Sequence, residues 1–189
     1  HFMSWVVAAS IFSMILSPTS AGLVNDVLMK LHLITDNIYF LGDQKWWRFS
    51  YYIINVWKDT GWGTIIFMAT LAGISPELYE AASMDGANRF QKMIYITLPA
   101  LNNTIVTVLV LNLAKVMNLF ESVFVLQNDA VIKVSDVLQT YIYTQTFNSG
   151  AIPDYGYTTA VGMFSSIISC ILVLVCNRVS HKTRGRGIV

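Results

Sequence analysis

Four polar residues recur at helical spacing in an otherwise apolar segment: Asn112, Lys115, Asn118 and, at the end of the series, Glu121. Residues three apart lie on the same face of a helix. Their amide and charged groups could supply the donors and acceptors that a hydroxyl-bearing solute needs. The alternative is that Lys115 extends to a membrane interface and the asparagines bond to neighbouring helices. The two interpretations have equal weight.

A second group of candidates is aromatic, and it precedes and enters an apolar run in the first half of the chain: Trp46, Trp47, Tyr51, Tyr52, Trp57 and Trp62. Aromatic faces are good platforms for sugar rings, and Trp57 is a candidate for a solute path on this ground. Trp and Tyr are also common where membrane proteins meet the interface with water. This second interpretation, an interfacial belt, is favoured.

No residues are grouped in a pattern that predicts catalysis, metal binding or nucleotide binding by this chain. The histidines are scattered at positions 1, 32 and 181, and Cys170 and Cys176 lack the spacing of a metal or redox motif. The glycine-rich phosphate loop of ATPases is missing from the sequence. We therefore predict no catalytic residue, no metal site and no cofactor bound by the chain itself.

A more polar segment in the middle of the chain has clear helix boundaries. Ser75 is a suitable N-cap, Pro76 suits the first helical position, and Glu77 lies near the positive end of the helix dipole. Gly86 can adopt a positive φ and end this helix, and a second short helix is predicted from Asn88 to Ile96. The product is a compact helix–turn–helix whose exposed small and apolar residues could fit a groove on another protein. The alternative is an amphipathic interfacial hairpin with no special role.

The composition indicates the environment in which these segments fold. Charged residues make up 12% of the 189-residue chain, hydrophobic residues 54%, and the mean hydropathy is +0.54. A soluble domain carries about 25% charged residues, so the chain is predicted to be a membrane protein. The net charge of +1 argues against a nucleic-acid partner.

The apolar runs predict four membrane-spanning helices in an all-α protein. We place them at residues 1–17, 53–73, 99–120 and 157–177, with Pro99 starting the third span because proline suits the first turn of a helix.

The basic residues set the predicted orientation. Four of them fall in the C-terminal tail, residues 178–189, which contains no acid and is therefore predicted to be cytoplasmic. Counting back across two spans puts the loop 74–98 on the same side and the segments 18–52 and 121–156 outside. Ser135 is a candidate cap for a helix through Phe147 in the second outer segment.

The first residues also carry an expectation. The chain starts His1-Phe2-Met3 without an initiator methionine or the basic start of a signal peptide. We therefore expect sequence upstream, beginning at or within a membrane helix.

The middle loop carries a motif with fixed spacing. Glu80-Ala81-Ala82 is followed after three residues by Gly86 and after nine more by Ile96-x-Leu98-Pro99. This pattern resembles the EAA loop of the permeases of binding-protein-dependent ABC importers. It is most similar to their carbohydrate-uptake branch, in particular permeases for oligosaccharides or polysaccharide fragments. Two further matches support that branch, namely the Trp57-Lys58-x2-Gly61-Trp62 run before the motif and the Leu78-Tyr79-Glu80-Ala81-Ala82-x2-Asp85-Gly86-Ala87 run within it.

The resemblance covers essentially the whole chain, and it implies a particular fold and a role for the middle loop. The fold would be that of a type I ABC importer permease, N-terminally truncated, with about four of its six core spans present. The loop would be a coupling helix that docks into an ATPase subunit, and its implied docking residues are Glu80, Ala81, Ala82, Met84, Asp85, Gly86, Ile96, Leu98 and Pro99.

The resemblance also implies partner subunits and a cellular location. The chain would work with a second permease subunit in a heterodimer, with ABC ATPase subunits that use ATP and Mg, and with an extracytoplasmic solute-binding protein. It would lie among lipids as a multi-pass protein of the bacterial cytoplasmic membrane, pass a sugar by alternating access, and have a cytoplasmic C-terminus. It would not itself be an enzyme.

The competing hypothesis is a stand-alone secondary transporter or an integral-membrane enzyme. A secondary transporter usually shows charges near the bilayer midplane and internal symmetry, and an enzyme needs a clustered catalytic set. The sequence shows neither pattern, which favours the importer.

Overall fold

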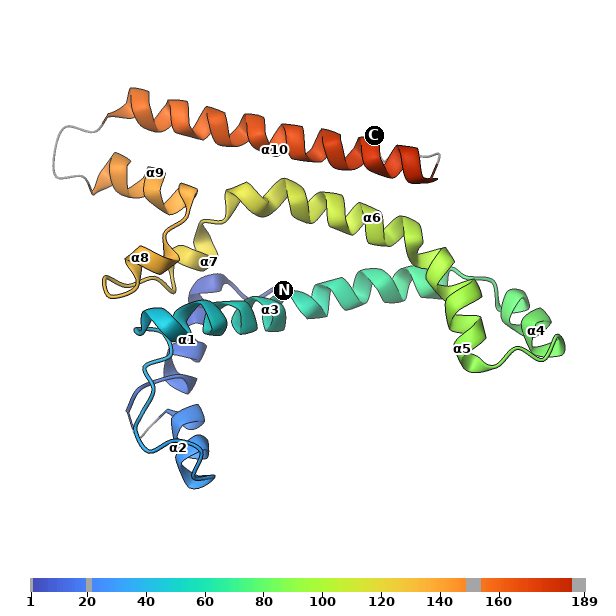
Figure 1. Cartoon of the computed structure of the whole chain (residues 1–189), viewed down its shortest axis with the longest axis horizontal. Helices are drawn as coiled ribbons and strands as arrows, with labels where there is room; N and C mark the ends of the chain where they lie inside the picture. Colours follow the sequence, from blue (N-terminus) through green and yellow to red (C-terminus); the bar gives the residue numbers. More distant parts are fainter. Residues whose placement is uncertain (1, 20–21, 149–153, 185–189) are drawn as a thin grey trace. The chain divides into compact units, whose positions relative to one another are not determined.

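The computed structural model describes residues 2–19, 22–148 and 154–184, and these ranges contain helices and connecting turns but no strand (Figure 1). Residues 20–21 and 149–153 of the two predicted outer segments, and the end of the basic tail from residue 185, lie outside the described residues. The all-helical fold predicted from the sequence is confirmed for the described ranges.

The described chain divides into two compact units, which share two long helices. These are α3, Gln44–Ala72, and α10, Tyr155–Arg184. The first unit holds residues 1–59 and 117–167, and the second holds residues 60–116 and 168–189.

The first unit is built around a buried aromatic pair in the first half of α3. It contains five further α-helices: α1 Trp5–Ile15, α2 Leu23–Lys30, α7 Glu121–Phe124, α8 Ile132–Ser135 and α9 Leu138–Phe147. Trp47 and Tyr51 stack with their ring centroids 5.1 Å apart and are only 3% and 9% exposed. The Trp47 indole nitrogen donates to the Leu126 carbonyl at 3.0 Å, and the hydroxyls of Tyr51 and Ser122 lie 2.9 Å apart. These bonds satisfy the polar atoms of the pair, so both rings can be buried at little cost.

The second unit contains the end of α3, a helical hairpin and α6. The hairpin consists of α4, Pro76–Met84, and α5, Arg89–Lys92, after which the π-helix Met93–Thr97 leads into α6, Leu98–Lys115. A hydroxyl contact of 2.9 Å between Thr70 and Thr104 joins α3 to α6. Val110 is the one α6 residue that the structure buries.

Within the described ranges, two helical runs are long and apolar enough to cross a membrane: Arg89–Asn118 and Tyr155–Arg178. Few residues in their most apolar stretches are buried within the chain, so these side chains are available to lipid or to other helices. α1 is apolar but has 11 residues, which is short of the roughly 20 that cross a bilayer. The four predicted spans and their orientation therefore stay predictions.

The observed helices differ from the expected ones in three places. α3 starts at Gln44, well before the predicted span at residue 53, because its first turns pack in the core. Pro99 lies in the first turn of α6 as expected, but the π-helix joins α5 to α6 in one continuous run from Arg89. Ser135 ends α8 instead of capping α9, and its hydroxyl donates to the Val131 carbonyl at 2.8 Å; Val137 occupies the N-cap of α9.

Candidate functional site

The 74–98 hairpin begins as its sequence predicts. Ser75 has the extended backbone of an N-cap (φ −60°, ψ 129°), Pro76 takes the first position of α4, and Glu77 lies in the first turn. The Ser75 side chain makes no capping hydrogen bond, so proline and the helix dipole favour this start instead of a capping hydroxyl.

α4 ends in a Schellman motif centred on Gly86. The Gly86 amide donates to the Ser83 carbonyl at 3.1 Å, and the Ala87 amide donates to the Ala82 carbonyl at 2.9 Å. These are the two bonds that define this cap. Gly86 has φ +79°, and apart from its two chain neighbours no residue has an atom within 4 Å of the place where a Cβ would be built. The glycine is therefore required by its backbone conformation and not by crowding.

The return helix has its own cap. The Asn88 side chain accepts from the Gln91 amide, and the Gln91 side chain accepts from the Asn88 amide, both at 2.8 Å. This reciprocal pair is a capping box, and it starts α5 at Arg89, three residues after the glycine.

A π-helix then connects α5 to α6. The Leu98 amide donates to the Met93 carbonyl, five residues earlier. Proline has no amide hydrogen and would break an ordinary α-helical ladder, and the wider π turn directly precedes Pro99 in a helix that stays continuous. Such single π turns are frequent at functional sites.

The hairpin presents an accessible surface that could dock on a partner. No residue of α4, α5 or the π-helix is buried. Met84 is 89% exposed and Leu78 55%. The residues that the resemblance marks for docking fall into two groups. The exposed group is Glu80, Ala81, Met84, Asp85, Gly86, Leu98 and Pro99, and the half-buried group is Ala82 and Ile96.

Side-chain bonds hold the two arms of the hairpin together. The hydroxyls of Tyr79 and Thr97 lie 2.9 Å apart, and the Lys92 ammonium donates to the Ser83 hydroxyl at 2.6 Å. Neither pair was a candidate from the sequence, because residues this far apart in the chain form no periodic pattern.

The predicted polar stripe is divided between the two units. Asn112 and Lys115 are exposed near the end of α6, whereas Asn118 and Glu121 belong to the first unit. The regular spacing is interrupted by a 3₁₀ turn, Val116–Asn118, so Glu121 begins a separate helix. The Gln139 amide donates to Asn118 Oδ1 at 3.3 Å and to the Met117 carbonyl at 3.2 Å.

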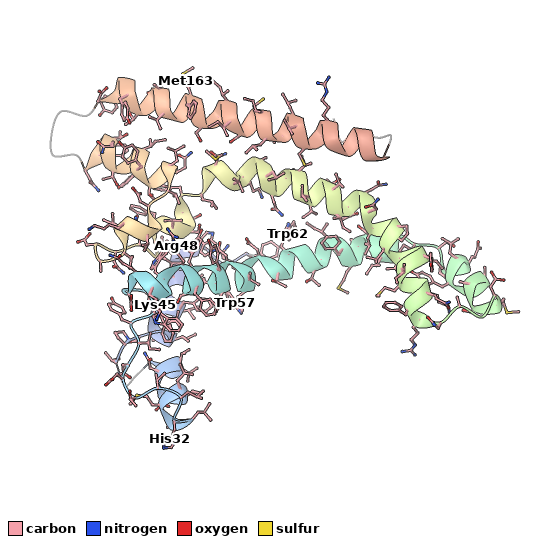
Figure 2. The ribbon with its side chains drawn as sticks, in the orientation of Figure 1. His32, Lys45, Arg48, Trp57, Trp62 and Met163 are labelled. Atoms are coloured by element: carbon pink, nitrogen blue, oxygen red, sulfur yellow. The ribbon has the colours of Figure 1, made fainter. Side chains whose placement is uncertain are left out.

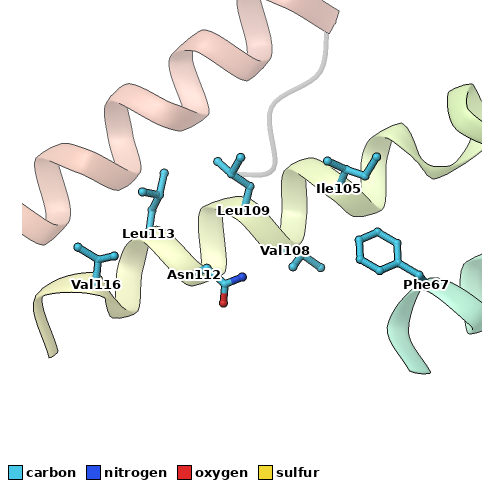
Figure 3. Close-up of a pocket in the computed structure, with 7 residues that line it drawn as sticks. All are labelled: Phe67, Ile105, Val108, Leu109, Asn112, Leu113 and Val116. Atoms are coloured by element: carbon cyan, nitrogen blue, oxygen red, sulfur yellow. The ribbon is translucent and has the colours of Figure 1, made fainter. Parts of the chain in front are cut away.

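A shallow pocket of about 380 Å³ lies beside Asn112 (Figure 3). Its lining is otherwise apolar, and it consists of Phe67 from α3 together with Ile105, Val108, Leu109, Leu113 and Val116. Asn112 supplies the only polar side chain among these lining residues. One amide in an apolar groove fits either a passing solute or a neighbouring helix, so the two interpretations of the stripe stay open.

The aromatic candidates separate into buried and exposed residues. Trp47 and Tyr51 form the core of the first unit and therefore belong to neither a belt nor a solute platform. Trp57 is 54% exposed and packs edge-on against Phe12 at 5.2 Å, and Trp62 is 41% exposed (Figure 2).

One charged residue of the Trp57–Trp62 run is buried. Lys58 is only 9% exposed, and its ammonium lies 4.6 Å from the centroid of the Trp5 ring. A cation over an indole face is stabilised by the ring quadrupole, most strongly when desolvated. The signal for it was the position of Lys58 within a predicted span, where ionisable residues are functional candidates by default.

Comparison with known proteins identifies relatives for almost the whole chain. Residues 2–185 match the family described as the binding-protein-dependent transport system inner membrane component. The chain is 40% identical over its whole length to the protein LplB of Bacillus subtilis (strain 168), of which it covers 58%. It is 38% identical, again over its whole length, to the polygalacturonan/rhamnogalacturonan transport system permease protein YteP of the same organism, covering 57%.

A solved structure has the same fold. It is the crystal structure of a bacterial alginate ABC transporter in complex with an alginate pentasaccharide-bound periplasmic protein. The TM-score is 0.91 at 34% identity, over 100% of this chain and 64% of that one. The chain therefore spans between half and two thirds of the length of these relatives.

Proposed function

The chain belongs to the family of binding-protein-dependent transport system inner membrane components, and from this premise we propose that it is a transmembrane permease subunit of an ATP-driven sugar importer. Its role is to pass an oligosaccharide across the bacterial cytoplasmic membrane by alternating access. In this arrangement the 74–98 hairpin and the C-terminus face the cytoplasm.

The observation that carries this proposal is the geometry of the hairpin. α4 starts at a proline, ends in the Schellman motif at Gly86 and has no buried residue, and it carries Met84 at 89% exposure. An exposed, conformationally fixed helix that ends in an apolar side chain suits docking into a groove. We infer that Glu80, Met84 and Asp85 contact a separate ATPase subunit, which binds ATP and Mg and supplies the energy.

The remaining partners follow from the family and the relatives' names. An extracytoplasmic binding protein delivers the sugar, and a second permease subunit completes the pathway as a heterodimer. The relatives named for polygalacturonan/rhamnogalacturonan and alginate support an oligosaccharide substrate. Asn112, Lys115, Asn118, Glu121 and Trp57 are the residues of this chain that we propose for the sugar path.

A copurification experiment tests the coupling assignment. The full-length chain is expressed with its neighbouring transporter subunits, and the tagged permease is isolated from membranes as wild type, Glu80→Lys and Met84→Ser. We expect both variants to lose most of the bound ATPase while keeping normal amounts of permease in the membrane, since neither side chain supports the fold.

Asp129→Lys is the matched control, because Asp129 is also an exposed acid but lies outside the hairpin. It should retain the ATPase. If the wild type retains the ATPase and both hairpin variants do so equally well, the docking role of α4 is excluded. If no ATPase accompanies the wild type, the importer function itself is contradicted.

The sugar path is tested by transport. With the binding protein and ATPase present, Asn112→Ala and Asn118→Ala together should slow ATP-driven uptake of radiolabelled oligosaccharides drawn from a panel of neutral and uronic-acid trisaccharides. Uptake at the wild-type rate for every sugar that the wild type imports would remove these residues from the path.

A further inference from the structure

Four hydrogen bonds form a closed ring inside the 74–98 hairpin. Tyr79 and Thr97 meet through their hydroxyls at 2.9 Å, and the Thr97 hydroxyl donates to the Lys92 carbonyl at 3.4 Å. The Lys92 ammonium donates to the Ser83 hydroxyl at 2.6 Å, and the Ser83 hydroxyl donates to the Tyr79 carbonyl at 2.6 Å. The ring therefore returns to the residue at which it starts.

The directions of these bonds are mutually consistent. A threonine hydroxyl has one hydrogen, and that of Thr97 is used on the Lys92 carbonyl. The Tyr79 hydroxyl must then be the donor in its contact with Thr97. The Ser83 hydroxyl likewise accepts from Lys92 and donates to Tyr79. Each hydroxyl that both accepts and donates is polarised by its neighbours, which strengthens a chain of bonds.

The ring connects elements that the backbone joins only through a turn. Tyr79 and Ser83 belong to α4, Lys92 ends α5, and Thr97 is the last residue of the π-helix before α6. Between α4 and α5 the chain passes through Asp85–Asn88, where no residue is buried. Without a packed core, a turn of this kind is a soft link, and side-chain bonds across it fix the angle between the arms.

We propose that this ring locks α4 to the beginning of α6, so that the docking helix and the membrane helix move as one rigid body. The inference rests on the proposed function, because it specifies how force applied to α4 reaches α6. Tyr79 and Thr97 are positioning residues in this scheme. They face into the hairpin, act on α4 and α6 through each other, and leave the exposed docking surface unchanged.

Spin-label distances test the rigid body directly. In the full transporter, with Cys170 and Cys176 replaced by serine, labels are placed at Glu77→Cys on α4 and Asn103→Cys on α6, both exposed positions. Their distance distribution is measured without nucleotide and with MgATP plus vanadate. For the wild type we expect one narrow distribution that is the same in both states, since a rigid body keeps its internal distances.

Variants that open the ring should broaden this distribution about twofold. Thr97→Val and Tyr79→Phe each remove a hydroxyl at nearly constant shape, and Thr97→Ser restores the hydroxyl and the narrow distribution. Thr107→Val is the matched control in α6, because the Thr107 hydroxyl donates only to the Asn103 carbonyl of its own helix. If any hydroxyl change in this region disturbed the fold, the distribution would also broaden in Thr107→Val and in Thr97→Ser.

Two results would overturn the proposal. One is a distribution in Thr97→Val and Tyr79→Phe as narrow as in the wild type, and the other is a wild-type distance that changes between the two nucleotide states. Failure of the importer function is separately visible, because a permease without a bound ATPase still reports on the ring in the nucleotide-free measurement.

Discussion

Two short helices of this protein, α2 and α4, end with the same backbone hydrogen bonds but with different residues in the left-handed position. At the end of α2 the His32 amide donates to the Met29 carbonyl and the Leu33 amide to the Leu28 carbonyl, both at 3.0 Å. The residue with positive φ is His32 (φ 55°) at the end of α2 and Gly86 (φ 79°) at the end of α4. Histidine carries a strain there that glycine does not.

The surroundings of the two helices account for this difference. Asn25 of α2 is completely buried. Its amide nitrogen donates to the carbonyls of Ser17 and Ile38 at 2.8 and 2.9 Å, and its oxygen accepts from the Ile38 amide at 3.0 Å. These three hydrogen bonds tie Asn25 to the segments before and after α2, and they can hold the turn at His32 in its strained conformation. α4 has no buried residue, so its turn must be favourable by itself.

The comparison shows how stability and accessibility are divided between the two regions. The buried Asn25 side chain fixes α2 by using its polar groups for hydrogen bonds inside the protein. The hairpin is fixed by caps and a ring of bonds, which leave its apolar side chains free to bind a partner. Three substitutions test this division, and they are ordered by expected effect.

Asn25→Ala should have the largest effect. It leaves two carbonyls and one amide without their partner, and buried unpaired groups cost about 1–3 kcal/mol each before relaxation. We expect the free energy of unfolding to fall by about 3 kcal/mol, measured by chemical denaturation of the purified complex in detergent. Asn103→Ala, at an exposed position of α6, should change the free energy of unfolding by much less. Equal losses in the two variants would show that the hydrogen bonds of Asn25 add no stability beyond that of an exposed asparagine.

Gly86→Ala should have an intermediate and local effect. Alanine meets no neighbouring atom but must adopt a positive φ, at a cost of about 1 kcal/mol. We expect faster hydrogen exchange of the α4 and α5 amides with little change in global stability. Gly61→Ala is the control, because Gly61 is equally uncrowded but lies within α3 without a positive φ. The substitution there should be neutral or slightly stabilising, and protection of the hairpin amides unchanged by Gly86→Ala would refute the role of the glycine.

His32→Gly should have the smallest effect, and in the opposite direction. Glycine relieves roughly 1–2 kcal/mol of left-handed strain but loses about 0.5–1 kcal/mol of conformational entropy on folding. We expect a net gain of about 0.5 kcal/mol, visible as a slightly higher melting temperature. A loss of stability would mean that the imidazole contributes contacts that outweigh the strain.

The parts of the hairpin that the sequence predicts correctly are local. The start at Pro76, the break at Gly86 and the second start at Asn88 each depend on the conformational preference of one or two residues. The same kind of reasoning fails at Ser135. It is a good capping residue by type, but it ends α8 instead of preceding α9, and its hydroxyl donates to the Val131 carbonyl.

The features that depend on distant residues were not predictable. Trp47 is a typical interfacial residue by type, but the Leu126 carbonyl and the Tyr51 ring hold it in a core that forms only when segments far apart in the chain meet. The ring through Tyr79 and Thr97 likewise has no sequence signature. The π-helix escapes a search for α-helical periodicity, because its wider turn shifts the register.

That π-helix also sets the rotational phase between the hairpin and α6. Each residue of an α-helix advances the chain by about 100° around the axis. A π turn closes over one residue more than an α turn, so a chain that lost one residue between Met93 and Thr97 could close ordinary α turns there with nearly the same phase. A residue lost within α6 itself, where no wider turn absorbs it, would swing α5 and α4 by about 100° around the axis of α6. The hairpin should therefore tolerate many point substitutions but very few changes in length, which would aim an intact docking surface in the wrong direction.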